Sequence, residues 1–94
     1  MMDEHALRLA AALRGNWKRW HDLDRAAAVV ELINYGFSRR ELGRVAGCSE
    51  GLIRYIEKIG RWPMGLKDML AQGYPTRLVA EAWQAQQRRQ AAPD

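Results

Sequence analysis

The sequence contains one cysteine, three prolines and no long run of apolar residues. Because Cys48 is alone, the chain can form neither an internal disulfide framework nor a cysteine-based metal site. Apolar stretches such as residues 26–30 fall far short of the roughly 20 residues that a membrane-spanning helix needs. The segment after Met1 is acidic and then amphipathic, unlike a secretory signal. We therefore expect a cytoplasmic protein without membrane contact.

Patterns typical of catalysis and metal binding are also lacking. His5 and His21 lie far apart with no third ligand at metal spacing, so both are expected on the surface. Cys48 has no histidine near it in sequence, which favours a buried structural thiol over a nucleophile. No glycine-rich phosphate loop and no serine-centred catalytic elbow occurs. The sequence thus predicts no enzyme, no cofactor, no metal and no small-molecule ligand.

Positive charge is concentrated in one part of the chain. The formal net charge of the 94 residues is +4. Residues 36–62 hold only three acidic residues against six basic ones, Arg39, Arg40, Arg44, Arg54, Lys58 and Arg61. Three of the four net charges therefore fall in this stretch, which indicates a polyanionic partner there.

Helix-favouring Ala and Leu are abundant and β-branched residues are scarce, so we expect an all-α fold. Capping and terminating residues recur every ten to fifteen positions, which predicts a small bundle of about five to six helices. The length indicates a single domain, 1–94. Its expected parts are an N-terminal helix with a tryptophan-containing connector (1–21), a helix-turn-helix core (22–62), supporting helices (63–90) and a disordered tail (91–94).

Apolar spacing predicts the buried side of the helices. After a cap at Asp3, the first helix is expected to bury Ala6, Leu7, Ala10, Ala11 and Leu13. After a cap at Asp22 or Asp24, the second is expected to bury Leu23, Ala27, Val30 and Ile33. After a cap at Ser49, the fourth is expected to bury Leu52, Ile53, Ile56 and Ile59. In the supporting helices, Leu66, Met69 and Leu70 are expected inward, and Leu78, Val79, Ala82 and Trp83 are expected on one stripe. Tryptophans 17 and 20 fit a core or a dimer interface equally well, whereas Trp62 fits the core.

Residues 38–59 satisfy the local requirements of a helix-turn-helix in one register. Ser38 and Glu41 have the spacing of a capping box before the first helix. Gly43 provides a small residue where the second helix crosses, and Gly47 tolerates the positive φ of the turn. Cys48 can fill the corner behind the turn. The alternative is an ordinary corner of a helical bundle with the same capping residues.

If Ile53 and Ile56 point inward, the outward residues of the second helix are Glu50, Gly51, Arg54, Tyr55 and Lys58. This face would enter the major groove, where Arg54 can bind guanine and Tyr55 a phosphate or a thymine methyl. Glu50 would accept from a cytosine amine or hold a neighbouring arginine. The expected phosphate contacts are Ser38, Arg39, Arg40, Ser49, Lys58 and Arg61. A merely solvated face is the alternative.

The segment from Leu32 to Trp83 resembles the central DNA-binding domain of ParB-type partition proteins and related KorB-type plasmid repressors. The matching residues are Gly36, Phe37, Ser38, Arg39, Arg40, Glu41, Leu42, Gly47, Cys48, Ser49, Ile53, Arg61, Trp62, Pro63, Leu66, Met69, Leu70, Gly73 and Ala80. The resemblance implies a recognition helix from Ser49, buttressed by the helices after Pro63. Val79 replaces a histidine common in that family, and its nucleotide-binding domain has no counterpart, so we expect no CTP binding.

Together these features predict a sequence-specific double-stranded DNA-binding protein, a plasmid, phage or chromosomal repressor associated with the nucleoid or a plasmid. A single recognition helix covers few base pairs, so a homodimer on a two-fold operator is expected. The first helix, tryptophans 17 and 20, and the region after Thr76 are candidates for that pairing. The alternative is a protein-binding adaptor, or an accessory partition factor that does not read DNA sequence.

Overall fold

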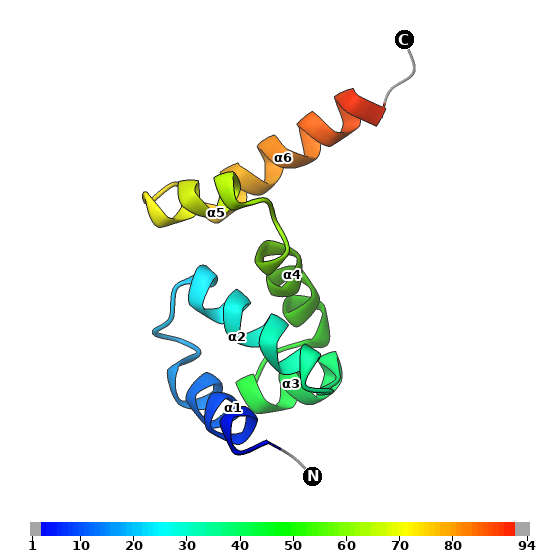
Figure 1. Cartoon of the computed structure of the whole chain (residues 1–94). Helices are drawn as coiled ribbons and strands as arrows, with labels where there is room; N and C mark the ends of the chain where they lie inside the picture. The colour runs from blue at the N-terminus through cyan, green and yellow to red at the C-terminus, as the bar shows by residue number, and fades with distance from the viewer. Residues whose placement is uncertain (1–2, 92–94) are drawn as a thin grey trace. The chain divides into compact units, whose positions relative to one another are not determined.

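The computed structural model describes residues 3–91, which form six helices and no strand (Figure 1). The helices are α1 (Glu4–Asn16), α2 (Asp22–Asn34), α3 (Arg39–Ala46), α4 (Glu50–Gly60), α5 (Met64–Ala71) and α6 (Thr76–Ala91). The expected all-α class is therefore confirmed. None of the described helices is long and apolar enough to cross a membrane.

Local capping chemistry sets the beginnings of the first two helices. The Asp3 carboxylate caps α1 by accepting a hydrogen bond of 2.8 Å from the backbone N–H of His5, as expected. The cap of α2 is His21, whose Nδ1 accepts from the Leu23 N–H at 3.1 Å. The prediction of an Asp22 or Asp24 cap was wrong, because the imidazole nitrogen serves as acceptor one residue earlier. Both carboxylates instead lie in the first turn, where the helix dipole favours negative charge.

The compact unit formed by residues 3–62 has its core between α1, α2, α3 and α4. Its fully enclosed large side chains are Leu13, Val29, Leu32, Leu42, Ile53, Ile56 and Ile59. Helix α2 fully buries Ala26, Ala28, Val29 and Leu32. Of the residues predicted to be buried, Leu23, Val30 and Ile33 are half-buried and Ala27 is exposed. Residues 26–30 are five consecutive apolar residues and so lie all around the helix. Their spacing therefore does not determine which side of α2 faces the core. Leu7 and Ala11 of α1 are also exposed, contrary to expectation.

The last turn of α4 lies close to α2 at Gly60. A Cβ added to Gly60 would lie 2.6 Å from Cγ2 of Val30 and 3.0 Å from the Ala26 carbonyl oxygen. The absence of a side chain at this position therefore lets α4 approach the middle of α2. This contact helps to fix the orientation of α4, whose other side carries the candidate site.

The connector between α1 and α2 is held by Trp17 and Arg25. The Trp17 side chain is buried, with the Arg25 guanidinium 4.9 Å from the centroid of its ring. Arg25 Nε also donates a hydrogen bond of 2.6 Å to the Trp17 carbonyl oxygen. Trp17 therefore belongs to the core, whereas Trp20 and Trp62 are only partly buried.

The second compact unit begins at Pro63, the N-cap of α5, and contains α5 and α6 packed together. Leu70 and Val79 are buried, whereas Leu78 and Ala82, expected on the same stripe as Val79, are exposed. Gly73 between the helices has φ +102°, a conformation that favours glycine. The single domain and the supporting role of these helices remain predictions. Ala91 is the last residue of α6, and residues 92–94 of the expected disordered tail lie outside the described residues.

Candidate nucleic-acid interface

The chain bends sharply between α3 and α4 at Gly47. This residue ends α3 in the left-handed conformation with φ +76°, and its N–H donates to the Gly43 carbonyl oxygen at 2.8 Å. The Cys48 N–H donates to the same oxygen at 2.9 Å. A Cβ on Gly43 would lie 2.8 Å from the Cys48 carbonyl oxygen, so the turn packs directly against the backbone of α3. The positive φ expected at Gly47 and the need for a small residue at Gly43 are confirmed.

Side-chain caps fix the beginnings of both helices. The Ser38 hydroxyl accepts from the Glu41 N–H at 3.0 Å, and the Glu41 carboxylate accepts from the Ser38 N–H at 3.3 Å. This is the predicted capping box. The Ser49 hydroxyl accepts from the Leu52 N–H at 3.1 Å and caps α4. Each serine hydroxyl retains its own hydrogen, which can still be donated to a phosphate oxygen.

Cys48 lies partly buried behind the turn. Desolvation raises the pKa of its thiol, and the nearby positive charge of Arg25 opposes this shift only in part. A thiol with a raised pKa is mostly protonated at neutral pH and is a poor nucleophile. The environment is therefore that of a structural side chain.

The two sides of α4 differ in exposure. Ile53, Ile56 and Ile59 are buried, whereas the outward residues named from the sequence are all exposed: Glu50, Gly51, Arg54, Tyr55 and Lys58. Leu52 exposes 38% of its surface, so its predicted burial was wrong. Leu52 lies in the first turn of α4, one turn before Ile56, at the border between the buried and the exposed side of the helix.

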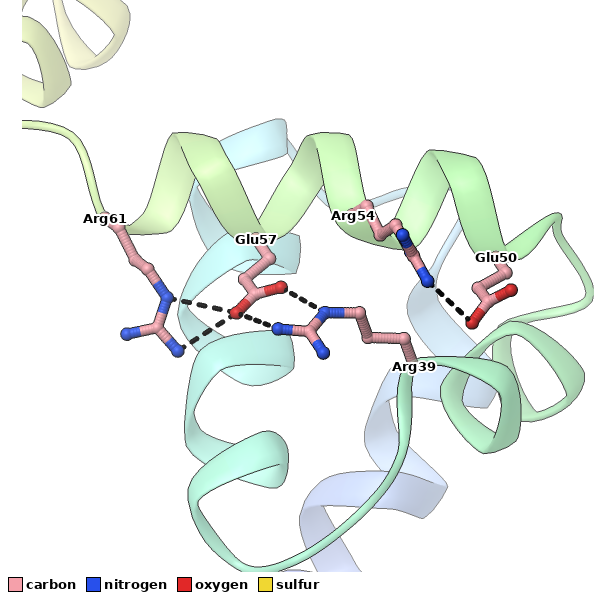
Figure 2. Close-up of polar contacts among 5 residues, drawn as sticks. All are labelled: Arg39, Glu50, Arg54, Glu57 and Arg61. Carbon is pink, nitrogen blue, oxygen red and sulfur yellow. Dashed lines mark hydrogen bonds and ion pairs between the residues drawn. The ribbon is translucent and has the colours of Figure 1, made fainter.

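A buried carboxylate, to which the sequence assigned no role, links the two helices. Glu57 is 7% exposed and is the one buried charged residue in the described part of the chain. Its carboxylate accepts from Arg39 Nε at 2.6 Å and Arg39 Nη2 at 3.0 Å, and from Arg61 Nε at 3.0 Å. Figure 2 shows Glu57 between the guanidinium groups of these two arginines. The beginning of α3 is thereby tied to the end of α4.

Electrostatics at this cluster favour the charged forms. The hydrogen bond from Arg39 is the main cause that holds the pKa of Glu57 below its ordinary value, and the hydrogen bond from Arg61 lowers it further. Burial of the carboxylate acts in the opposite direction but does not outweigh these two arginines. The same interaction raises the pKa of Arg39. The spacing of Glu57 from Arg61, four residues on one helix, was visible in the sequence. Arg39 lies 18 residues from Glu57, and only the fold brings them together.

Arg39 and Arg61, both named as phosphate contacts, keep part of their surface available. Their side chains are 43% and 52% exposed, respectively. A guanidinium has five N–H donors, and those of each group that are not bonded to Glu57 remain free for an anion. The three side chains together carry a net charge of +1. The cluster is thus a pair of oriented arginines with one neutralising carboxylate.

The remaining predicted site residues lie at the solvent-exposed surface of α3 and α4. Arg54 Nη2 lies 3.3 Å from Glu50 Oε1, on the same edge of α4 as Glu57 (Figure 2). This contact matches one of the two expected roles of Glu50, the holding of a neighbouring arginine. Arg40 and Lys58 are exposed and form no ion pair within residues 3–91. Arg44, in the last turn of α3, adds a further exposed positive charge.

Comparisons with protein-family models, curated proteins and solved structures give no match. The resemblance to ParB-type and KorB-type DNA-binding domains therefore stays a prediction.

Proposed function

We propose that the protein binds double-stranded DNA in a sequence-specific manner through α3 and α4, acting as a helix-turn-helix repressor. The observation that carries the proposal is the exposed polar and basic side of α4, which follows directly on a tight turn at Gly47. In this motif the second helix lies in the major groove while the first crosses the backbone. Helix α4 is accordingly the proposed recognition helix.

Base recognition is assigned to Arg54, assisted by Glu50. An arginine can donate two hydrogen bonds to O6 and N7 of guanine, and the contact with Glu50 uses only one of the five N–H donors of Arg54. The contact of 3.3 Å with Glu50 restricts the rotamers of Arg54 before DNA arrives, while 62% of its side chain stays exposed. Tyr55 and Lys58 lie farther around the exposed side of α4, within reach of the neighbouring base pair and the backbone.

Phosphate binding is assigned to two groups of residues. Arg39 and Arg61 form the first, and Glu57 fixes the directions of their guanidinium groups. The unpaired side chains of Arg40 and Lys58, with the hydroxyls of Ser38 and Ser49, form the second. Since each neutralised phosphate releases counterions, four basic contacts give a slope of log K against log salt of about −3.6.

Operator binding is proposed to involve a homodimer, because α4 alone spans only a few base pairs. Two recognition helices about one helical turn apart would read a two-fold operator. A protein-binding adaptor, the alternative class, needs an apolar exposed side on α4. The charged residues on that side, Arg54, Lys58 and Glu50, favour DNA instead.

The proposal is tested by selecting bound sequences from a random duplex pool and then measuring affinities for the selected site. Replacing Arg54 with Ala should weaken binding to the selected site by about 1–3 kcal/mol and relax the sequence preference at one base pair. Arg8→Ala is a matched control, since Arg8 is paired with Glu4 at 2.9 Å on the exposed side of α1. Failure to enrich any sequence, or equal losses for both variants, would contradict the proposal.

A further inference from the structure

The unit formed by α5 and α6 leaves much of its apolar surface exposed. Met64 and Leu78 expose 70% and 59% of their surfaces and Tyr74 exposes 52%. Within residues 63–91, only two large side chains are fully enclosed, Leu70 and Val79. Units below about 40 residues usually depend on a disulfide, a metal or association for stability. Residues 63–91 contain no cysteine. Contact with a partner surface would therefore bury apolar side chains that this unit leaves exposed.

Helix α6 presents an exposed apolar seam consisting of Leu78, Ala82 and Ala85. Their spacing of four and then three residues places them on one side of the helix, and all three are exposed. Val79 is buried and Trp83 partly buried on the neighbouring side, and α6 packs against α5. Over this one heptad, the 4–3 spacing matches the positions through which paired helices contact each other.

The charges beside the seam indicate which helix would fit. Glu81 and Arg88 are seven residues apart and so flank the seam on the same side. When two identical helices pair in antiparallel orientation, this flank faces itself, and Glu81 of each copy lies beside Arg88 of the other. Arg88 forms no ion pair within the described chain, whereas Glu81 contacts Arg77 at 3.2 Å. Arg89 follows Ala85 by four residues and so lies at the end of the seam, where parallel pairing would bring the two Arg89 side chains together.

We infer that α6 is a self-association surface, at which two copies of the chain pair antiparallel along the seam, with Glu81 of each copy facing Arg88 of the other. Two such units form a four-helix arrangement, in which exposed apolar side chains become buried. The biological purpose of this dimer rests on the proposed function, because the second copy would supply the second recognition helix. Its physical basis, however, is independent of DNA.

Sedimentation equilibrium of the full chain without DNA, from micromolar to submillimolar concentration, tests this inference. The chain should reach a dimer, and Ala82→Lys should raise the dissociation constant at least about tenfold by placing like charges at the seam. Gln87→Lys, with the same charge change on the far side of α6, should leave it unchanged. Circular dichroism of each variant checks that helix content is retained.

A charge exchange tests the orientation. Glu81→Arg and Arg88→Glu should each weaken the dimer, and the double variant should recover most of the loss, a coupling that altered folding of one chain would not produce. A chain that stays monomeric, or a dimer insensitive to Ala82→Lys, would overturn the inference, and a lack of rescue would overturn the antiparallel pairing. Dimers that bind no duplex would refute the proposed function alone. Monomers that bind duplex would refute only the inference.

Discussion

Glu57→Gln is the substitution for which the structure makes the most specific prediction. The change keeps the size of the side chain but removes the charge that two arginines share. A glutamine offers one carbonyl acceptor, and its amide group would point N–H donors at guanidinium N–H donors. At least one of the three hydrogen bonds is therefore lost, and the link between α3 and α4 is weakened.

The expected magnitude follows from the environment of the cluster. Hydrogen bonds to charged groups contribute roughly 1.5–3 kcal/mol each where both partners are desolvated. Here the carboxylate is buried, but both guanidinium groups are about half exposed, so water replaces part of what is lost. We expect Glu57→Gln to lower the free energy of unfolding by about 1–3 kcal/mol.

Urea denaturation at neutral pH, followed by circular dichroism, measures this change. Glu50→Gln is the matched control, since the ion pair of Glu50 with Arg54 is exposed on the same helix. That control should lose no more than about 0.5 kcal/mol. Equal stabilities of the two variants would refute the role assigned to the Glu57 cluster.

The pH dependence of stability gives a second measure of the same substitution. Because the folded-state pKa of Glu57 is lowered, its contribution is complete above the ordinary glutamate pKa. The contribution is lost as the pH falls from that value through the lowered folded-state pKa. Unfolding curves of the wild type should therefore show a loss of stability in this acidic range that Glu57→Gln lacks. Parallel pH profiles would count against the pairing.

Three further substitutions test the turn and the DNA-contacting side. Gly43→Ala should destabilise the fold by about 1–3 kcal/mol in thermal unfolding, because the added Cβ would meet the Cys48 carbonyl oxygen. An unchanged stability would show that the turn does not pack against this residue. Gly47→Ala should cost about 1–2 kcal/mol, since φ is +76° and nothing crowds the site, and an unchanged melting temperature would refute a left-handed residue here. Lys58→Ala should weaken binding to every duplex equally and reduce the salt slope by about 0.9, whereas a sequence-dependent loss would assign Lys58 to a base.

Much of the local structure could be predicted because local chemistry determines it. The capping box of Ser38 and Glu41, the left-handed Gly47 and the small Gly43 each satisfy a requirement of a few neighbouring residues. The outward side of α4 followed from the spacing of Ile53 and Ile56. These features depend on helical periodicity and backbone sterics, which the sequence expresses directly.

Features that the local pattern leaves ambiguous, or that depend on contacts distant in sequence, could not be predicted. The rotation of α2 was missed because an unbroken apolar segment, 26–30, fits several registers. The His21 cap was missed because histidine accepts at a helix start only as the suitable tautomer. The Arg39–Glu57 contact spans 18 residues and requires the fold of α3 against α4. The local sequence marks Glu57 only as a partner of Arg61, and not as an acceptor shared with Arg39.

The most direct test of DNA binding by α4 is a titration of the isotope-labelled full chain with a short duplex. The changes in backbone amide chemical shifts are measured by nuclear magnetic resonance at each step. At low salt, the largest shifts should fall in the segment from Ser49 to Lys58 and at the beginning of α3, with little change at Arg8 and the rest of α1. Raising the salt concentration should reverse them. Unchanged spectra, or shifts concentrated outside α3 and α4, would contradict the account.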